Sequence, residues 1–361
     1  MAVKLFKRKL PPKATTSSLL NTTTIALDAM GGDRGPRVVI AAALRVLKKH
    51  DNLRIILVGD ETIVAKRLKA LKALGHPRIQ IKHTTEIVEM DESPATALRG
   101  KKDSSMRVSI NLVHEGIADA CVSAGNTGAL MATSRFVLKM MPGIDRPAIV
   151  SMMPSAGSIG SYILDLGANV DSTPEHLFQF AVMGSILANS VKNNSFSRVA
   201  LLNIGEEDIK GNELVKQTSL LLSECEAINY IGFVESDQIF SHAADVIVCD
   251  GFVGNVALKS SEGVAKLINS IISAEFKKNV LTRCLAIIAF PVLRSIRKRL
   301  DPSRYNGATF LGLNGIVVKS HGGANVLGYE HAIEEAIMEV EKNVPEKIKA
   351  QLSSLLSANN S

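Results

Sequence analysis

The chain contains no tryptophan, and only 4% of its 361 residues are aromatic. A large hydrophobic core must therefore consist mainly of Ile, Val, Leu, Ala and Met side chains. The four cysteines are too widely separated for a zinc-ligand spacing: Cys121, Cys225, Cys249 and Cys284. The apolar sequence around Cys121 and Cys249 is typical of buried thiols. The simplest interpretation is a reduced, cytoplasmic protein that holds no metal.

Long apolar runs and several common enzyme motifs are also missing. No uninterrupted apolar run reaches the roughly 18 residues that a membrane-spanning helix needs, and the basic N-terminus lacks the apolar core of a signal peptide. No Gly-x-Gly-x-x-Gly follows the first predicted strand, and the chain has neither a Walker-type phosphate loop nor a Gly-x-Ser-x-Gly elbow. These absences argue against a membrane-crossing protein, a standard dinucleotide site, a Walker-type ATP site and a serine acyl-enzyme.

The positive charge of the chain is concentrated at its N-terminus. The formal net charge is +7, with 46% hydrophobic and 21% charged residues, which are values typical of a globular protein. Five basic residues precede the first acidic residue, Asp28: Lys4, Lys7, Arg8, Lys9 and Lys13. The remainder is nearly balanced and carries no RNA- or DNA-binding motif, so we expect no nucleic acid partner. Because residues 11–24 are rich in Ser, Thr and Pro, residues 1–23 are predicted to be a flexible leader.

The body of the chain alternates between strand-like and helical segments. Short apolar runs predict strands at residues 24–28, 53–59, 118–123, 148–153, 162–165, 199–202, 228–233 and 246–248. Helical stretches are predicted from Pro36, over residues 63–74, after Asn126 and over residues 174–189, with Thr173 as a cap. This alternation favours parallel βαβ units and an open, mostly parallel α/β sheet. We expect one body over residues 24–345 and a C-terminal tail over residues 346–361.

Residues 275–300 have a different character. Apolar residues recur there at helical spacing, namely Leu281, Leu285, Ile288, Val292 and Ile296. Basic residues surround them: Lys277, Lys278, Arg283, Arg294, Arg297, Lys298 and Arg299. Pro291 should divide the segment, which predicts a protruding amphipathic helix pair within about residues 256–300. The pair either packs on the core or a dimer partner, or forms an exposed tip on an anionic membrane leaflet.

Polar, glycine-containing motifs follow five of the predicted strands, at residues 28–33, 123–128, 165–171, 203–207 and 250–255. In open parallel sheets, ligands bind beyond the carboxyl ends of the strands. Glycine lets the backbone approach a ligand, and helix N-termini attract anions. A single such motif is usually only a turn, but five of them predict one shared, anion-compatible crevice.

Taken in order, these motifs resemble those of the phosphate acyltransferase (PlsX) family. Met90–Pro94 and Arg99–Ser105 are part of the same pattern, which extends from about residue 24 to residue 330. The resemblance implies a fold similar to the isocitrate and isopropylmalate dehydrogenases and to phosphotransacetylase. It also implies a homodimer at the cytoplasmic face of the membrane, with no metal, nucleotide or other cofactor.

The implied reaction transfers a long-chain fatty acyl group from acyl carrier protein to inorganic phosphate. Because that carrier is acidic, the basic residues around Arg294 would contact either the carrier protein or anionic lipid. The product of the reaction, an acyl phosphate, would feed a membrane glycerol-3-phosphate acyltransferase of the PlsY type in phosphatidic acid synthesis. Such a reaction requires a site that positions phosphate beside a thioester carbonyl. It also requires donors for the charge that develops on the carbonyl oxygen.

Three residues are predicted to be catalytic. Lys210 would be the cation for phosphate or the oxyanion, Asn255 would donate to the carbonyl oxygen, and His321 would protonate the leaving sulfur. The residues predicted to bind substrate or phosphate are Asp28, Gly31, Gly32, Asp33, Ser123, Gly125, Asn126, Thr127, Asp165, Asn169, Glu206, Asp250 and Gly254. The alternatives are a solvated surface lysine for Lys210, helix caps for Asn126, Thr127 and Asn255, and structural roles for His321 and the aspartates.

Other functions remain open at the level of sequence. An oxidoreductase on the related dehydrogenase fold would bind a nicotinamide cofactor. A phosphotransacetylase-like enzyme would use acyl-coenzyme A as its donor. A non-catalytic membrane scaffold would bind liposomes yet release no thiol, and Cys121 or Cys249 as an acyl carrier would require activity to fall when the cysteine is replaced.

Overall fold

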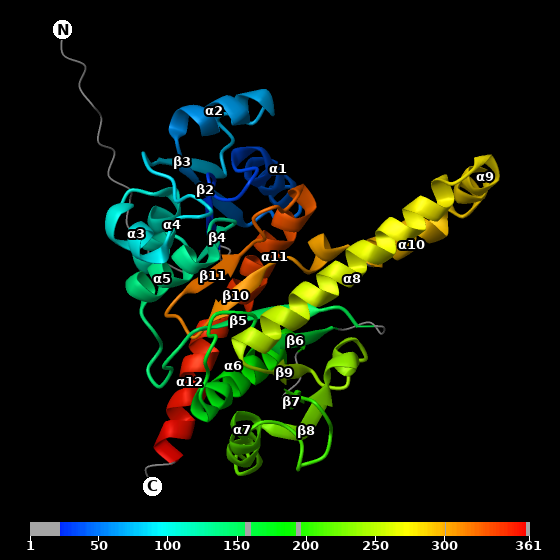
Figure 1. Cartoon of the computed structure of the whole chain (residues 1–361). Helices are drawn as coiled ribbons and strands as arrows, with labels where there is room; N and C mark the ends of the chain where they lie inside the picture. The colour runs from blue at the N-terminus through cyan, green and yellow to red at the C-terminus, as the bar shows by residue number, and fades with distance from the viewer. Residues whose placement is uncertain (1–21, 156–159, 193–195, 300, 359–361) are drawn as a thin grey trace.

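In the computed structural model, residues 22–155, 160–192, 196–299 and 301–358 are described. Within them, short apolar runs form the strands of one 11-stranded sheet (Figure 1). The first half of the sheet contains β1 (Thr23–Asp28), β2 (Leu53–Gly59), β3 (Ile79–His83), β4 (Ala120–Ser123) and β11 (Ile316–Lys319). The second half contains β6 (Ser161–Leu164), β7 (Arg198–Asn203), β8 (Asn229–Glu235) and β9 (Val246–Val248). Between the halves lie β5 (Ala148–Met153) and β10 (Ala308–Leu311).

The sheet is open and mostly parallel, as the sequence predicts. The strand order is β3-β2-β1-β4-β11-β10-β5-β6-β9-β7-β8. All neighbours within each half pair in parallel. The antiparallel pairings are β11 with β10, β10 with β5, and β5 with β6. Three reversals in succession make the strands of the second half run opposite to those of the first.

The twist of the sheet compensates for this reversal. Neighbouring strands are rotated by about 25° on average, so the successive steps from β1 to β9 add up to roughly half a turn. A strand that runs in the opposite sense and is rotated by nearly half a turn points almost the same way as β1. The carboxyl ends of both halves therefore face the same side of the molecule.

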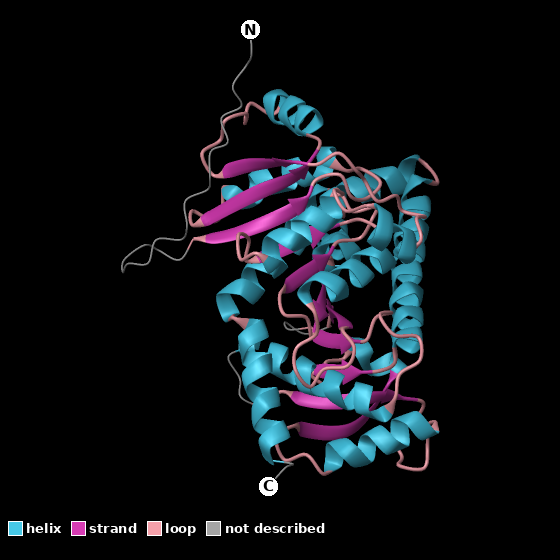
Figure 2. Cartoon of the chain, turned by 90° about the vertical axis from the view of Figure 1, so that its left-hand side faces the viewer, coloured by secondary structure: helices cyan, strands magenta, loops and turns pink. Residues whose placement is uncertain are grey.

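Helices cover both faces of the sheet (Figure 2). Around the first half lie α1 (Pro36–Leu47), α2 (Glu61–Ala70), α3 (Pro94–Gly100), α4 (Ser105–His114), α5 (Thr127–Leu138) and α11 (Val326–Lys342). Around the second half lie α6 (Pro174–Lys192), α7 (Glu213–Ser223), α12 (Val344–Ala358) and the short 3-10 helix η1 (Ser236–Phe240), whereas the 3-10 helix η2 (Pro302–Tyr305) packs on α11. Side-chain caps begin several of them; Thr173 accepts from the N–H of His176 at the start of α6 (3.4 Å), as expected.

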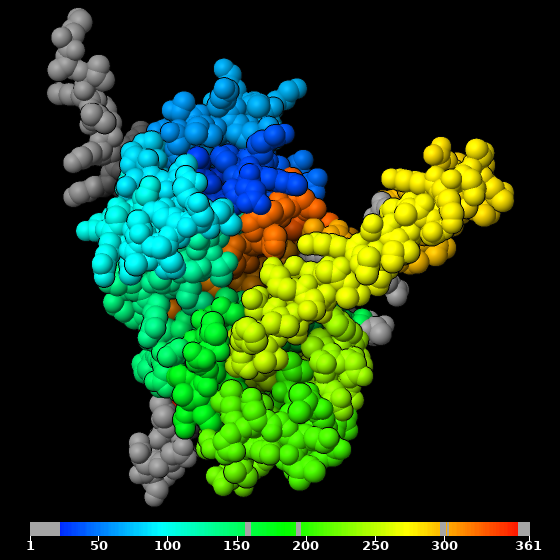
Figure 3. All heavy atoms as spheres, in the orientation of Figure 1, coloured from blue at the N-terminus to red at the C-terminus, as the bar shows by residue number. Residues whose placement is uncertain are grey.

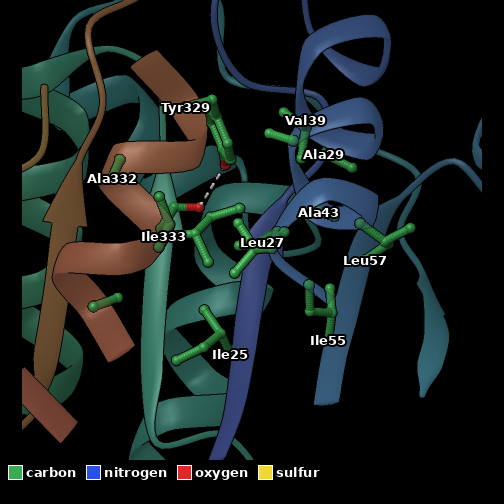
Figure 4. Close-up of a cluster of buried hydrophobic side chains, with 14 of the residues drawn as sticks. Ile25, Leu27, Ala29, Val39, Ala43, Ile55, Leu57, Tyr329, Ala332 and Ile333 are labelled. Atoms are coloured by element: carbon green, nitrogen blue, oxygen red, sulfur yellow. Dashed lines mark hydrogen bonds between the residues drawn. The ribbon is translucent and has the colours of Figure 1, made fainter. Parts of the chain in front are cut away.

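The core of the first half is an aliphatic layer between β1, β2, α1 and α11 (Figure 4). Ile25 and Leu27 alternate along β1 and face this layer because side chains two residues apart share one face of a strand. The hydroxyl of Tyr329 donates to the carbonyl oxygen of Val122 (3.1 Å), so the buried phenol is satisfied. Burying each large apolar side chain stabilises the fold by about 1.5–3 kcal/mol. This layer therefore holds the ends of β1 and β2 in fixed positions.

A long helical arm leaves the body after β9 (Figure 3). It consists of α8 (Gly251–Lys277), α9 (Val280–Ile288) and α10 (Phe290–Arg299). Pro291 lies in the first turn of α10 and separates it from α9, because proline lacks the N–H that a helix interior requires. The predicted protruding helices are thus confirmed, although the arm begins at Gly251 rather than near residue 256. None of the described helices combines the length and apolar character that a bilayer crossing demands.

The two ends of the chain differ in what the structure describes. Of the predicted leader, only Thr22 and Thr23 are among the described residues, and Thr23 begins β1. The segment expected to be a C-terminal tail is helical as part of α12 through Ala358. Ile348 and Leu352 of that helix are buried in the core of the second half.

Candidate active site

Asp28, at the end of β1, forms hydrogen bonds with its own loop, with the start of α4 and with the end of β4. Its side chain is only 1% exposed. Oδ1 accepts from Ser105 Oγ (2.6 Å) and from the N–H of Gly31 (3.1 Å), and Oδ2 accepts from Ser123 Oγ (2.6 Å). Ser123 Oγ in turn accepts from the N–H of Gly125 (3.1 Å). Asp28 and Ser123 therefore shape the loops after β1 and β4, and their oxygens are already used within the protein.

Glycines let these loops approach one another. A Cβ at Gly31 would lie 2.4 Å from Asp28 Oδ2. Gly32 has φ +82°, and a Cβ there would lie 2.8 Å from Ala124 Cβ and 2.9 Å from the carbonyl oxygen of Gly322. The loops after β1, β4 and β11 therefore interlock only because these positions lack side chains.

The N-terminus of α5 leaves backbone donors available. Asn126 is the N-cap: its Oδ1 accepts from the N–H of Ala129 (2.9 Å), and its Nδ2 donates to the carbonyl oxygens of Met90 (2.7 Å) and Glu92 (3.1 Å). The side chain of Asn126 is thus a helix cap, which was one of the two alternatives. Within the described residues, nothing accepts from the N–H groups of Thr127 and Gly128. Such groups at a helix N-terminus favour an anion.

Lys319, at the end of β11, is a site residue that the sequence motifs did not indicate. Its side chain is only 8% exposed. Nζ donates to the carbonyl oxygens of Ala124 (3.2 Å) and Ser320. Burial lowers the pKa of Lys319 to about 8, although the nearby charges of Asp28 and Asp33 oppose this shift. A signal was available in the sequence, because a lysine that ends the apolar strand Ile316–Lys319 is unusual inside a protein.

His321 follows directly and has a defined tautomer. Its Nδ1 accepts from the N–H of Gly323 (3.0 Å), which leaves Nε2 as the protonated nitrogen. Burial and the positive charges of Lys259 and Lys319 lower its pKa, against the opposite effect of Glu262. The ring is therefore neutral at pH 7 and carries a proton that it can donate.

In the second half, Asp165 organises the loop after β6. This buried carboxylate accepts from the N–H groups of Ile149 (2.9 Å) and Ala168 (3.0 Å). It also accepts from the N–H (2.7 Å) and Nδ2 (2.9 Å) of Asn169. Burial raises the pKa of Asp165, whereas these four bonds act in the opposite direction. Asp165 and Asn169 thus hold the loop rather than extend into solvent.

Asp250, after β9, caps α8 and accepts from the N–H groups of Phe252 (2.9 Å) and Val253 (3.0 Å). Gly251 and Gly254 are buried against the Asp165 loop. The cap is therefore Asp250, so the alternative of a cap role for Asn255 is wrong. The side chain of Asn255 is exposed and lies beside Gly167, where an added Cβ would be 3.4 Å from that of Asn255.

The loop after β7 presents Lys210. Nδ2 of Asn203 donates to the carbonyl oxygens of Gly205 (3.0 Å) and Lys210 (3.4 Å), which curls the loop. The side chain of Lys210 is exposed. Glu206 Oε1 accepts from Gln238 Nε2 (2.7 Å) in η1. The ammonium group of Lys210 thus faces solvent from a loop whose conformation Asn203 fixes.

In the order of the strands, the five motif-bearing ends form two groups, with β1 and β4 in the first half of the sheet and β6, β9 and β7 in the second. Helix α8 connects them. It begins at the cap Asp250, and Lys259 lies about 14 Å further along at a rise of about 1.5 Å per residue. The charge of Lys259 affects the pKa of both Lys319 and His321, which places this part of α8 beside the ends of β4 and β11.

Neither buried cysteine is poised as a nucleophile. Burial raises the pKa of Cys121 and Cys249 well above the ordinary value, so both remain thiols. Among the residues that the structure describes, no group of three or more His, Cys, Asp or Glu side chains is arranged to hold a metal ion.

Comparison with known proteins gives matches over nearly the whole chain. The family model described as "Fatty acid synthesis protein" matches residues 23–347. A phosphate acyltransferase from Legionella pneumophila is 54% identical over 338 residues, covering 94% of this chain and 98% of the relative. One from Coxiella burnetii is 57% identical over 335 residues, covering 92% and 97%. A phosphotransacetylase from Streptococcus pyogenes shares the fold, with a TM-score of 0.59, 18% identity and coverage of 89% of this chain and 94% of that one.

Proposed function

Because the chain belongs to the phosphate acyltransferase family and is therefore an acyltransferase, we propose that it transfers a long-chain fatty acyl group from acyl carrier protein to inorganic phosphate. The observation that carries the proposal is the identity of 54–57% to phosphate acyltransferases over more than nine-tenths of the chain. In the reaction, a phosphate oxygen attacks the thioester carbonyl carbon. The carbon–sulfur bond then breaks, giving an acyl phosphate, and the carrier thiolate takes up a proton.

The two groups of strand ends suit the two substrates. The N–H groups of Thr127 and Gly128 bind the phosphate at the N-terminus of α5. Asn255 and Lys210, on the second half, donate to the carbonyl oxygen as negative charge develops on it. His321 supplies the proton to the leaving sulfur from Nε2. Positioning supplies much of the catalysis, because a thiolate leaves readily and no covalent enzyme intermediate is required.

The arm supports a location at the inner face of the cytoplasmic membrane. At its tip, Leu281, Leu285 and Ile288 are 70%, 48% and 77% exposed, far from the body (Figure 3). Arg294 is exposed on the returning helix, and the side chains of Arg297, Lys298 and Arg299 lie outside the described residues. Apolar side chains with neighbouring cations suit insertion into an anionic membrane surface. Peripheral contact would deliver the acyl phosphate to a membrane glycerol-3-phosphate acyltransferase of the PlsY type for phosphatidic acid synthesis.

A second copy of the chain would cover the apolar face of α8. Val264, Leu267 and Ile271 recur at helical spacing there, and each is more than half exposed. A contiguous apolar face of this kind is typical of a protein interface. We therefore include a homodimer in the proposal.

The test is phosphate-dependent thiol release from long-chain acyl carrier protein by the purified chain. We expect release of one carrier thiol for each acyl phosphate formed, and none without phosphate. If thiol is released from acyl-coenzyme A but not from acyl carrier protein, the acyl donor is coenzyme A and the proposed donor is wrong. Binding to liposomes without any thiol release would identify a scaffold instead of an enzyme.

A further inference from the structure

The ammonium group of Lys319 is buried without a counter-ion. Its two partners, the carbonyl oxygens of Ala124 and Ser320, are neutral. Within the described part of the chain, no carboxylate forms an ion pair with Nζ. Burying a charge that is not paired is costly, so proteins rarely retain one without a function. An ammonium group has three N–H donors, and two carbonyls leave one of them for a further acceptor.

The two nearest acids do not fill that role. The oxygens of Asp28 already accept from two serine hydroxyls and from backbone N–H groups. The carboxylate of Asp33 lies beside the two glycines that follow His321. A Cβ added at Gly323 would be 3.3 Å from Asp33 Oδ2. Both acids act on Lys319 through space, and neither is in contact with it.

Apart from Asp28 and Asp33, the groups around Lys319 are neutral, basic or already paired, since Glu262 on α8 forms an ion pair with Lys259 (3.5 Å). On β4 and α11, burial raises the pKa of Cys121 and Tyr329 well above their ordinary values, so neither carries a negative charge. Lys259 on α8 is positive, and His321 is a neutral donor. Ala124, which binds Nζ, precedes the available N–H groups at the start of α5 by only a few residues. Lys319 and the unused N–H groups of α5 therefore lie close together along the chain, and none of the nearby carboxylates, Asp28, Asp33 or Glu262, forms an ion pair with Lys319 in the described part of the chain.

We propose that Lys319 is the cation that binds inorganic phosphate, together with the N–H groups of Thr127 and Gly128. This inference rests on the proposed function and refines it, because it divides the two lysines between the substrates. Lys319 serves the phosphate on the first half, and the exposed Lys210 serves the thioester on the second half. Phosphate completes the ion pair that the buried lysine lacks, with charge-assisted hydrogen bonds.

The decisive variant is Lys319→Met, which keeps the length of the side chain and removes its charge. We expect the KM for phosphate to rise by about tenfold or more, with little change in the KM for the acyl donor. Lys319→Arg should restore part of the affinity. In the matched variant Lys210→Met, we expect kcat or the KM for the acyl donor to change and phosphate binding to persist. Lys69→Met, on the exposed face of α2, should alter neither constant.

Binding can also be measured without the acyl donor. Phosphate should raise the Tm of the wild-type chain and of Lys210→Met, but not that of Lys319→Met. A folded Lys319→Met variant that keeps the full phosphate-induced shift would overturn the inference. If wild type shows the shift but releases no thiol from acyl carrier protein, the phosphate site stands and the proposed acyl donor is wrong.

The pH dependence of the wild-type chain provides a test should Lys319→Met fail to fold. Phosphate binds to the protonated lysine, so the affinity measured by calorimetry should fall by about tenfold per pH unit above about 8. His321 is already neutral over this range, because burial and the neighbouring cations lower its pKa. A phosphate affinity that stays constant from about pH 7.5 to about pH 9.5 would contradict the assignment.

Discussion

Single glycines decide how the start of α8 meets the loop that Asp165 organises. A Cβ at Gly254 would lie 1.9 Å from the carbonyl oxygen of Asp165, and one at Gly251 would lie 2.4 Å from that of Asn169. Real Cβ atoms do not approach backbone oxygens so closely, so a side chain there would push the helix away. The position of Asn255, one residue further on, depends on this contact.

Gly254→Ala should therefore lower both stability and activity. We expect the free energy of unfolding to fall by about 1–3 kcal/mol, because an inserted methyl group forces the backbone to move. The matched control is Gly263→Ala on the same helix, where an added Cβ would meet no atom within 4 Å. It should gain up to about 1 kcal/mol from helix propensity. Urea unfolding followed by circular dichroism measures both, and equal midpoints for the two variants would contradict this account.

His321→Ala tests proton donation at the level of a single ring nitrogen. We expect kcat to fall by about tenfold to a hundredfold, below the upper range for general acid catalysis because thiolates leave readily. The loss should increase with the pKa of the leaving thiol in a series of acyl thioesters. His114→Ala, at the exposed end of α4, is the control. An equal loss for every thiol would show that His321 positions the loop and donates no proton.

At the scale of elements, we expect two parts of the arm to have different roles: the tip binds the membrane, and α8 forms the dimer contact. The tip carries Leu281, Leu285 and Ile288, whereas the apolar face of α8 carries Val264, Leu267 and Ile271. Replacing the three tip residues by Ser should lower partition onto anionic vesicles by more than about a hundredfold, because each buried side chain contributes about 1.5–3 kcal/mol. Turnover of a soluble acyl donor should be unchanged.

The corresponding replacement of the three α8 residues is the matched control. It should weaken self-association in sedimentation experiments and leave vesicle binding of the remaining dimer unaltered. Vesicle partition that falls equally in both variants would mean that the tip has no special role. Self-association that is lost only in the tip variant would assign the dimer contact to α9.

The sequence predicted the local elements better than their arrangement. Apolar periodicity located β1, β2, β4 and their following helices because those signals are contained in a few consecutive residues. The pairing of β11 with β4 joins residues almost 200 positions apart, and no local pattern encodes it. Lys319 was missed for this reason: only that pairing places its ammonium group beside Ala124.

The division of the strand ends into two groups could not be predicted for the same reason, since local patterns do not encode strand order. Each of the five motifs follows a strand, as predicted, but the sequence did not indicate that these strands belong to two different halves of the sheet. The antiparallel insertion of β10 and β5 between the halves spreads the motifs over a wide sheet. Twist then turns both groups to one side, and α8 extends from one to the other. These features depend on strand order, which short motifs do not specify.

At the scale of the whole molecule, the half-buried Glu335 and the buried Glu339 lie where the halves of the sheet join. Glu335 and Glu339 are one turn apart on α11, and Glu339 accepts from Thr309 Oγ1 on β10. Both acids affect the pKa of Tyr162, on β6. Burial raises the pKa of Glu335 to about 7 and that of Glu339 well above its ordinary value, and the charge of Glu335 raises the latter further. The folded chain therefore holds protons at this junction that the unfolded chain releases near pH 4.5.

The stability of the whole fold should depend on pH through this pair. A carboxyl with a raised folded pKa stabilises the native state fully below its unfolded pKa, and this contribution is lost as pH rises through the folded pKa. From about pH 5 to about pH 8, the free energy of unfolding should thus fall. Glu335→Gln, which mimics the protonated acid, should be about 1–3 kcal/mol more stable than wild type near pH 8 and flatten the profile. Urea titrations at a series of pH values measure this, with Glu341→Gln on the exposed face of α11 as the control. If Glu335→Gln is destabilised at pH 8, the carboxylate is ionised and paired in the native state, and the junction is held by charge rather than by buried protons.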